Sequence, residues 1–497
     1  MTWRKRLVLF CLGLLLALGQ APFDLSLIYF VILPYLGWMI RDIPTPKLGF
    51  GIGWWVALGY FALTLMWIVE PFFVEPEITG WMAPFALGLM AAGLALFWGA
   101  GFAAAVKIMP TGAGRLIVLA ITWTAFEYLR ANILTGFPWG HLSYGLVDLP
   151  IGQLAAFVGI HGAGLIILLI CFLPAMFAAR FWDGALWATI SFFILMAMGQ
   201  WWMHGPVAMN PDNTLVRVIQ PNAAQHLKWR RDMVDVFYGR QLGYTRAQTQ
   251  QRPDVVIWPE TAIPYLYGDS LSILQEIATA SGPTTSVIAG IVRTEGTAPR
   301  NSLLFLDPAG GPSALYDKQH LVPFGEYMPF ADLIDRMGLS GLTGLAGRFV
   351  SGTGSRVISG HNVPDFLALI CYEAIFPQYV RSSKNRPEWI VHITNDAWFG
   401  EFSGPYQHLA QAQMRAIEQG LPVVRSANTG VSAMIDPNGR ITHSMKLGTA
   451  GYFDAHLPAA HVSTVYARFG EWIWTVIAIL LLLGTLFNAT RPAREID

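Results

Sequence analysis

The sequence predicts a polytopic α-helical membrane protein, with about eight transmembrane helices, that carries an inserted α/β domain. Only 13% of its residues are charged, against about 25% in ordinary soluble domains. The apolar residues gather in long runs between residues 7 and 202 and in a last run over 472–487. Residues 204–470 instead have the composition of a soluble domain. The net charge is zero, so the composition does not indicate a nucleic-acid partner.

The apolar runs predict the membrane helices, because a bilayer core about 30 Å thick requires roughly 20 helical residues. The first run follows three basic residues, so it also resembles a secretory signal. Since further apolar runs follow it, we expect it to be a retained helix. The chain then divides into a membrane domain (1–203), a soluble domain (204–470), and a last helix with its tail (471–497). The predicted spans are 7–22, 25–40, 50–70, 81–107, 115–131, 151–179, 184–203 and 471–489.

The basic residues between the spans predict how the chain crosses the membrane, because Lys and Arg are enriched in cytoplasmic loops. The loops 70–80 and 131–150 contain neither Lys nor Arg. All short segments that contain Lys or Arg and that precede, connect or follow the spans therefore lie on the same side of the membrane. This places both chain ends in the cytoplasm and residues 204–470 outside it. The residues that set this orientation are Arg4, Lys5, Arg6, Arg41, Lys47, Lys107, Arg115, Arg180, Arg491 and Arg494.

The soluble domain alternates short apolar, β-branched runs with helical patterns, which is typical of an α/β fold with covered sheets. An Asn-Gly pair within 435–442 predicts a hairpin turn. The sequence contains no Gly-rich phosphate loop and no Cys/His cluster with metal-ligand spacing, so we expect no cofactor and no metal. The predicted strands are 214–221, 253–260, 285–292, 301–307, 366–373, 388–396 and 421–430, and the predicted helices are 231–248, 270–282 and 406–420.

Chemically reactive side chains accompany the ends of these strands. Glu260 follows one strand, Cys371 and Glu373 end another, and Lys318 lies in the segment between them. Each residue alone would favour a structural or solvated role. A thiol, a carboxylate and an ammonium together at strand ends, however, match the place where open α/β sheets carry out chemistry. Cys371 is the only cysteine of this domain, so it is a candidate reactive thiol.

These residue types predict acyl transfer through a thioester. A thiol with a pKa of about 8.5 is only a few per cent thiolate at pH 7, so a carboxylate is needed to take its proton. An ammonium stabilises both the thiolate and the oxyanion of a tetrahedral intermediate, an effect of roughly 3–4 kcal/mol per donor. His392 and His408 stand alone in the sequence, and we expect a structural or surface role for each.

The segments around these residues resemble the Glu-Lys-Cys motifs of the nitrilase superfamily. They are WPETAIP at 258–264, YDKQHLVPFGEY at 316–327 and ICYEAIFP at 370–377. The membrane spans narrow the resemblance to the apolipoprotein N-acyltransferase family, to which GFPWGHLSYG at 136–145 and NDAWFGEFSGPYQH at 395–408 are also similar. The resemblance covers nearly the whole chain and implies a nitrilase-like α-β-β-α sandwich for residues 204–470.

The resemblance implies a role for each member of the triad. Cys371 corresponds to the nucleophile, Glu260 to the general base and then the general acid, and Lys318 to the group that stabilises the oxyanion.

Further residues match positions around that triad. Glu326 and Glu373 correspond to supporting carboxylates that orient the lysine and tune the charge of the site. Tyr372 and Trp229 correspond to residues linked to substrate engagement. Trp229 is also typical of an aromatic side chain at a membrane interface.

The resemblance implies the last step of lipoprotein maturation. A fatty acyl chain moves from a phospholipid, typically phosphatidylethanolamine, to Cys371 and then to the α-amine of the S-diacylglyceryl cysteine of an apolipoprotein. It also implies a multi-pass protein of the bacterial inner membrane with its catalytic domain in the periplasm, and we expect a monomer. One alternative is a membrane-tethered nitrilase-type amidase, for which a single anchor would suffice. A transporter would have ionisable residues along its spans, where only Glu127 and Arg130 stand out.

Overall fold

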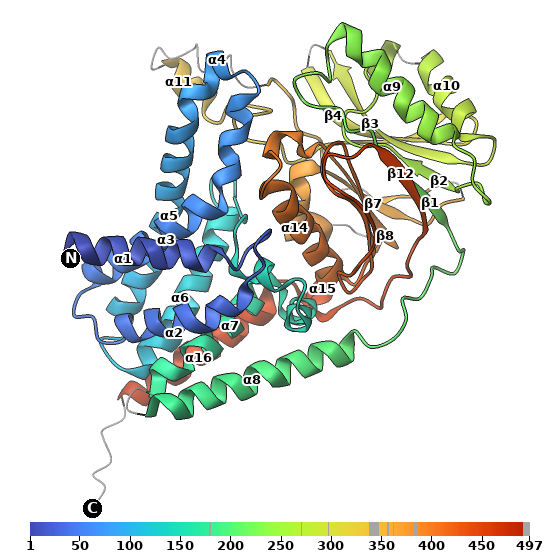
Figure 1. Cartoon of the computed structure of the whole chain (residues 1–497). Helices are drawn as coiled ribbons and strands as arrows, with labels where there is room; N and C mark the ends of the chain where they lie inside the picture. The colour runs from blue at the N-terminus through green and yellow to red at the C-terminus, as the bar shows by residue number, and fades with distance from the viewer. Residues whose placement is uncertain are drawn as a thin grey trace, which may run out of the picture. The chain divides into compact units, whose positions relative to one another are not determined.

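The computed structural model divides the chain into a helical unit and an α/β unit (Figure 1). The helical unit comprises Met1–Gly205 and the C-terminal part from Ser463, and the α/β unit is Pro206–Val462. Residues 463–470 group with the helices, although the sequence predicts a soluble domain over 204–470. The structure describes residues 1–177, 180–269, 271–296, 298–336, 347–354, 357–360, 362–381 and 385–490. The tail residues Arg491 and Arg494 lie outside these ranges.

A helix occupies each predicted span in the described part of the helical unit. The long helices are α1 (Trp3–Ala17), α2 (Tyr29–Ile40), α3 (Pro46–Thr64), α5 (Ala83–Ile108), α6 (Ala113–Asn132), α7 (Ala155–Phe177), α8 (Phe181–Trp202) and α16 (Trp472–Thr490). Shorter helices are α4 (Pro76–Thr79) and α15 (Val465–Phe469).

The predicted number of about eight membrane spans is not confirmed. Four helical segments of the described chain are long and apolar enough to cross a membrane: Pro76–Ile108, Pro150–Phe177, Phe181–Trp202 and Trp472–Thr490. A fifth results if α3 and the following 3₁₀ turn, which are bent by 46°, count as one span. With 15 and 12 residues, α1 and α2 extend only about 22 and 18 Å at 1.5 Å per residue. The coarser expectation, a set of apolar helices suited to a membrane, agrees with these segments.

Glycines allow the helices α1 and α3 to approach closely. A Cβ atom on Gly13 would lie 1.9 Å from the carbonyl oxygen of Val56, and one on Gly59 would lie 2.0 Å from that of Phe10. Small residues at such crossings are typical of helix pairs in membranes, where association depends on close packing. Larger side chains at either glycine would therefore separate these two helices.

Glu127 and Arg130, the two ionisable residues of helix α6 near its end, form a buried ion pair. Arg130 Nη2 donates to Glu127 Oε2 at 2.6 Å, and the indole of Trp98 donates to Glu127 Oε1 at 2.7 Å. Arg130 also donates to the carbonyl oxygen of Trp139 at 2.8 Å. Buried charges are tolerated only when they are paired and hydrogen-bonded, so this network explains their presence in an apolar helix without a transport pathway.

The α/β unit contains two six-stranded sheets within the described residues, with the strand orders β12-β1-β2-β3-β4-β5 and β11-β10-β9-β8-β7-β6. The strands are β1 (Leu215–Gln220), β2 (Val255–Ile257), β3 (Ser286–Glu295), β4 (Ala298–Leu306), β5 (Pro312–Asp317), β6 (Val357–Ile358), β7 (Phe366–Ile370), β8 (Trp389–Thr394), β9 (Val423–Ala427), β10 (Ser432–Ile435), β11 (Ile441–Met445) and β12 (Gly451–His456). The helices are α9 (Arg231–Arg246), α10 (Leu271–Ser281), α11 (Ala331–Arg336), α13 (Pro377–Arg381) and α14 (Gly404–Gln419).

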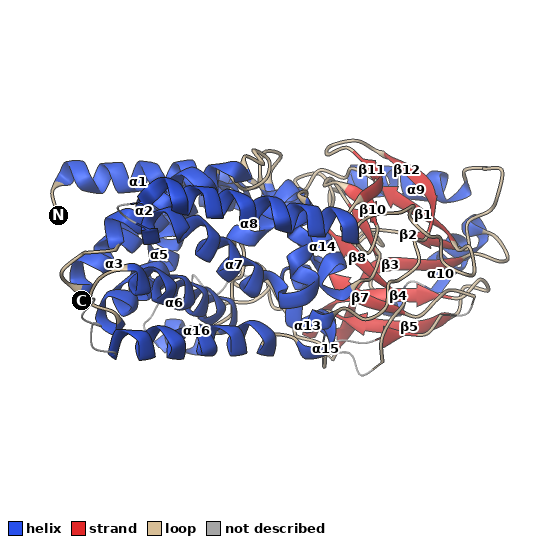
Figure 2. Ribbon diagram, turned by 90° about the horizontal axis from the view of Figure 1, so that it is seen from below, coloured by secondary structure: helices blue, strands red, loops and turns tan. Residues whose placement is uncertain are grey.

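The sheets and helices of this unit stack in layers (Figures 1 and 2). Side chains of α9 and α10 share an apolar cluster with β2 and β3, whereas α14 packs on β7, β8 and β9. The inner faces of the sheets meet where the rings of Phe305 and Phe366 lie 5.7 Å apart. Ser426 Oγ in β9 also donates to the carbonyl oxygen of Ile219 in β1 at 2.9 Å. The predicted α/β fold is thus confirmed, as a helix–sheet–sheet–helix arrangement.

Strand direction brings the ends of several strands to one edge. The strands β1, β2 and β3 run parallel to one another, as do β7, β8 and β9. The carboxyl ends of parallel strands lie at the same edge of a sheet, where side chains of the following loops converge. The predicted hairpin is also present, since β10 and β11 pair in antiparallel fashion.

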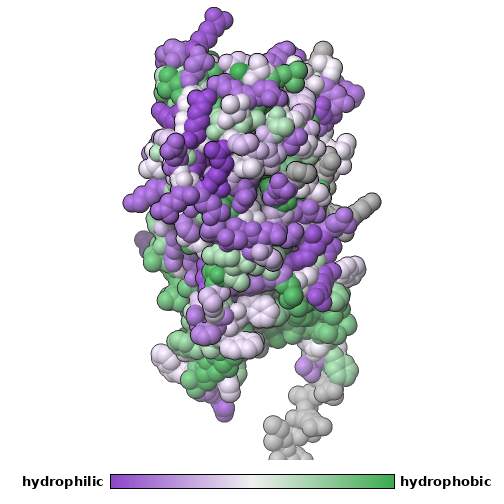
Figure 3. Space-filling view, turned by 90° about the vertical axis from the view of Figure 1, so that its right-hand side faces the viewer, coloured by the Kyte–Doolittle hydropathy of each residue, from purple (hydrophilic) through white to green (hydrophobic). Residues whose placement is uncertain are grey.

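The surfaces of the units differ in character. The exposed face of the α/β unit is mostly hydrophilic in Figure 3, whereas hydrophobic side chains gather on the helices. The helix α8 is mostly exposed, since only 11% of its most apolar stretch is buried inside the protein. An apolar helix with so few protein contacts is suited to a lipid environment rather than to water.

Candidate active site

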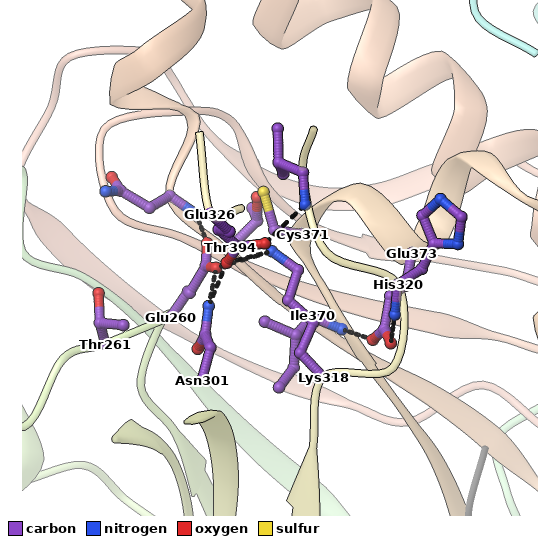
Figure 4. Close-up of polar contacts among 12 residues, drawn as sticks. Glu260, Thr261, Asn301, Lys318, His320, Glu326, Ile370, Cys371, Glu373 and Thr394 are labelled. Carbon is purple, nitrogen blue, oxygen red and sulfur yellow. Dashed lines mark hydrogen bonds and ion pairs between the residues drawn. The ribbon is translucent and has the colours of Figure 1, made fainter. Parts of the chain in front are cut away.

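Cys371 lies at a sharp turn where strand β7 ends. The apolar strand Phe366–Ile370 is wholly buried, and a 3₁₀ turn begins at Cys371. The residue has a φ of 51°, in the left-handed region that costs a non-glycine residue about 1–2 kcal/mol. Cys371 thereby lies beside Glu260, Lys318 and Glu326 (Figure 4).

Glu260 follows strand β2 and is buried. Its Oε1 accepts hydrogen bonds from Lys318 Nζ at 3.4 Å and from Asn301 Nδ2 at 2.7 Å. Its Oε2 accepts one from the backbone N–H of Asn395 at 2.8 Å. One donor in β4 and two donors directly after β5 and β8 thus hold the carboxyl group in one orientation.

Lys318 follows strand β5, and its side chain is 1% exposed. Its Nζ donates to Glu326 Oε1 at 3.0 Å as well as to Glu260. Burial alone would lower the pKa of Lys318, but the carboxylates of Glu326 and Glu260 outweigh this effect and raise the pKa above its usual value. The side chain therefore remains an ammonium at neutral pH.

Asn301 connects the two carboxylates that flank the lysine. Its Nδ2 lies 2.7 Å from Glu260 Oε1 and 3.0 Å from Glu326 Oε1. The other oxygen of Glu326 accepts the backbone N–H of Val322 at 2.8 Å. Both carboxylates and the ammonium thus belong to one network, in which Lys318 supplies the positive charge between the carboxylates and Asn301 adds a hydrogen bond to each.

The environment keeps the thiol of Cys371 protonated at rest. Burial raises the pKa of Cys371, the negative charge of Glu260 raises it further, and Lys318 and a hydrogen bond with Thr394 oppose the rise. A neutral thiol beside a carboxylate and an ammonium can lose its proton when it attacks an electrophile. The arrangement is suited to nucleophilic acyl chemistry.

Glu373 lies on the opposite side of the turn from the thiol. Its Oε1 accepts hydrogen bonds from Tyr316 Oη at 2.7 Å and from the backbone N–H groups of Gln319 and His320 at 2.6 and 3.2 Å. Its Oε2 accepts the N–H of Ile370 at 2.7 Å. Burial raises the pKa of Glu373 to about 7 against the effect of these hydrogen bonds. The side chain therefore fastens the segment after Lys318 to the Cys371 turn.

Tyr372 and Trp229 occupy different surroundings. Tyr372 is buried, and its ring centroid lies 5.6 Å from that of His320. Trp229 is 50% exposed, and the Nζ atom of Lys228 lies 5.2 Å from the centroid of its ring. The same Nζ donates to the carbonyl oxygen of Glu260 at 3.2 Å, so Trp229 lies one residue away from a direct contact with the Glu260 backbone.

Several residues of this site give no signal in the sequence. Asn301, Asn395 and Lys228 lie within a strand or a polar loop, where an amide or an amine gives no signal by itself. His392 and His408 do not stand alone: both are fully buried, and both contact the carbonyl oxygen of Cys371. In the described part of the chain, no group of three or more His, Cys, Asp or Glu side chains could hold a metal ion.

Two family models match the chain. Residues 12–173 match the apolipoprotein N-acyltransferase N-terminal domain, and residues 216–466 match carbon-nitrogen hydrolase. The α/β unit is therefore a carbon-nitrogen hydrolase domain of the nitrilase type.

Relatives match along nearly the whole chain. The apolipoprotein N-acyltransferase of Rhodopseudomonas palustris is 35% identical over 525 residues, with coverage of 99% of this chain and 96% of the relative. That of Bradyrhizobium diazoefficiens is 38% identical, with coverage of 98% and 95%. The chain belongs to the apolipoprotein N-acyltransferase family.

Solved structures of more distant proteins match about half of the chain. A Nesterenkonia amidase of the nitrilase superfamily has a TM-score of 0.36 at 16% identity and covers 54% of this chain and 98% of its own. A CN-hydrolase superfamily protein from Xanthomonas campestris has a TM-score of 0.36 at 18% identity, with coverage of 52% and 96%.

Proposed function

We propose that the protein transfers a fatty acyl chain from a phospholipid, through a thioester on Cys371, to the α-amine of the S-diacylglyceryl cysteine of an apolipoprotein. One observation carries this proposal: a chain similar to apolipoprotein N-acyltransferases over 99% of its length brings Glu260, Lys318 and Cys371 together at one edge of its carbon-nitrogen hydrolase domain. An amidase would need the same three groups but not a set of apolar helices.

In the first half-reaction, Cys371 attacks the ester carbonyl of the phospholipid. The bond between Sγ and the carbonyl carbon forms as the thiol proton passes to Glu260, and Lys318 stabilises the oxyanion. Collapse of the tetrahedral intermediate breaks the ester bond. The alkoxide that leaves takes the proton from Glu260, which produces a lysophospholipid and an acyl-enzyme.

In the second half-reaction, the amine of the acceptor attacks the thioester. Glu260 takes a proton from the amine, and the C–S bond breaks as the amide forms. Lys318 stabilises first the oxyanion and then the departing thiolate, which regains its proton from Glu260. Because the raised pKa of Lys318 keeps it an ammonium, we assign it charge stabilisation rather than proton transfer.

The neighbouring residues then have supporting roles. We assign Glu326 to orienting Lys318, because its carboxylate is 3.0 Å from Nζ, and Glu373 to fixing the segment after Lys318. Tyr372, beside the nucleophile, and Trp229, half exposed near Glu260, are the residues that we expect to contact the lipid substrates.

The transfer assay tests the function directly. Purified protein with phosphatidylethanolamine and a diacylated lipopeptide that has a free N-terminal amine should yield the triacylated peptide, detected by mass spectrometry as one added acyl group. An N-acetylated peptide is the matched control and should stay diacylated. Free fatty acid without acylated peptide would instead support the amidase alternative.

The distribution of Lys and Arg between the spans leads to a prediction of the membrane topology. We propose that the protein is a monomer of the bacterial inner membrane with residues 206–462 in the periplasm. Alkaline phosphatase, which folds only after export, should be active when it is fused at residue 268 of the α/β unit and inactive when it is fused after Arg41. The opposite pattern would exclude acylation of exported lipoproteins by this domain.

A further inference from the structure

Two buried histidines contact the carbonyl oxygen of Cys371. His392 belongs to β8, and its Nε2 lies 3.1 Å from this oxygen. His408 belongs to α14, and its Nε2 lies 3.2 Å from the same oxygen. The oxygen belongs to the residue whose φ of 51° is unfavourable for a side chain other than glycine. The backbone of the proposed nucleophile is thus held from behind by two separate elements.

The ring of His392 can donate to this oxygen in only one tautomer. Arg425 Nη1 lies 2.9 Å from His392 Nδ1, and a guanidinium only donates hydrogen bonds. Nδ1 therefore accepts, and the ring proton lies on Nε2, which faces Cys371. Burial and the charge of Arg425 lower the pKa of His392 well below its usual value, which keeps the ring in this neutral form.

The ring of His408 also has a proton on Nε2. Its Nδ1 lies 2.9 Å from Asp396 Oδ1 and 3.2 Å from Arg425 Nη2. A neutral ring with its proton on Nδ1 would donate to Asp396, but it would then turn the lone pair of Nε2 toward the Cys371 oxygen, which can only accept a hydrogen bond. The contact at 3.2 Å therefore requires the proton on Nε2, either in a neutral ring that accepts from Arg425 at Nδ1 or in a charged ring that donates to Asp396. In either form Nε2 has a proton and donates to the Cys371 oxygen.

Arg425 and Asp396 complete this cluster behind the nucleophile. They form an ion pair with each other, and neither side chain is exposed to solvent. Asp396 Oδ1 also accepts the hydroxyl of Thr394 at 2.9 Å. Removing two charges from water is costly, so a buried ion pair is weak evidence for a purely stabilising role. Its fixed geometry is the property that an apolar cluster could not supply.

We propose that His392 and His408 are positioning residues that hold the Cys371 turn through its carbonyl oxygen, with Arg425 and Asp396 fixing the orientation of both rings. The direction of the Cα–Cβ bond follows from the backbone conformation at Cys371, so release of the carbonyl group would move the whole side chain, Sγ included, relative to Glu260 and Lys318. A misplacement of about 1 Å can reduce the rate of a reaction by about a hundredfold. The proposal rests on the acyl-carrier role proposed for Cys371.

The test compares two substitutions at each histidine. His408→Gln and His392→Gln keep an N–H donor at a similar reach, whereas His408→Leu and His392→Leu keep the bulk and remove the donor. Acyl loading of Cys371 from phosphatidylethanolamine, per folded protein, is measured together with the alkylation rate of Cys371 by iodoacetamide. Arg217→Leu is the matched control, because Arg217 is a fully buried arginine paired with Asp454 at 2.7 Å outside the site.

We expect the leucine variants to load acyl groups at least tenfold more slowly, with a lower kcat and an unchanged KM, and the glutamine variants to recover most of the rate. The control should lose thermal stability but keep its loading rate per folded protein. Leucine variants with a normal loading rate would overturn the positioning role, as would glutamine variants as slow as the leucine ones. A wild-type enzyme that is alkylated at Cys371 but never acylated would overturn the proposed function instead.

Discussion

Enzyme incubated with phospholipid in the absence of an amine acceptor should accumulate about one fatty acyl group per chain on Cys371. A double-displacement reaction stops at the thioester when the second substrate is missing. The acyl group should be released by hydroxylamine, and about one equivalent of lysophospholipid should appear with it. Intact-protein mass spectrometry measures the adduct, and peptide mapping locates it.

Two cysteine substitutions control this experiment. Cys371→Ser should show no hydroxylamine-labile adduct and little turnover, because a serine hydroxyl is far less acidic than a thiol. Cys171→Ser should behave as the wild type, since Cys171 is a buried free thiol of α7 in the helical unit. An unmodified Cys371 during active turnover would contradict the covalent mechanism, and continuous release of fatty acid would indicate hydrolysis.

Replacement of the site ammonium should have the second large effect. Lys318→Met retains the length of the side chain but removes its charge, and we expect acyl loading to slow by a factor of about 10²–10³, as for the loss of an oxyanion donor. Lys318→Arg should restore little, because a planar guanidinium does not fit the site of a compact ammonium between Glu260 and Glu326. Single-turnover kinetics with phospholipid measure this rate.

Glu260→Gln separates acid–base chemistry from charge stabilisation. Because the same carboxylate is proposed to take the thiol proton and later that of the amine, both half-reactions should slow. Lys318→Met should mainly affect steps with a developing oxyanion or thiolate. Thermal unfolding of each variant checks that the protein is folded, and near-normal turnover of either variant would disprove the role assigned to that residue.

The sequence predicted the parts of the site that have reactive side chains at strand ends. Cys371 and Glu260 follow buried apolar strands, so their position at the sheet edge could be inferred from the pattern alone. The same reasoning did not identify Asn301, because it is the first residue of the predicted strand 301–307 and a neutral amide within a strand gives no signal of chemistry. Its contacts with Glu260 and Glu326 depend on the order of β2, β3, β4 and β5 in the sheet, which the residue pattern does not specify.

The histidine cluster escaped prediction for a different reason. His408 lies on a helix whose residues are nearly all buried, so no polar face marks it as exceptional. His392 lies on a central strand, beside Arg425 of the neighbouring strand in the observed register. Such pairings follow from the three-dimensional arrangement of β8, β9 and α14, and they could not be inferred from spacing along the chain.

For the membrane spans, the sequence predicted where the helices lie but not where each helix begins and ends. Apolar runs located the helices correctly, but the lengths of the helices depend on where they end. The helix α1 stops at Ala17, before the predicted end at residue 22, and α2 begins only at Tyr29. Hydropathy does not determine these boundaries. It therefore predicted where apolar helices lie, but not how many of them are long enough to cross a bilayer.

The position of Lys318 between Glu260 and Glu326 determines how charge moves during the proposed reaction. With a neutral thiol at rest, movement of the proton from Cys371 to Glu260 shifts charge between two neighbouring groups without changing their sum. The phospholipid ester and the free amine bring no net charge to the reacting atoms, and the ammonium between the two carboxylates, Lys318, stays protonated. Every intermediate of the cycle therefore has the same total charge. Such an electroneutral cycle needs no counter-ion to enter or leave, which suits catalysis on lipids where mobile ions are scarce.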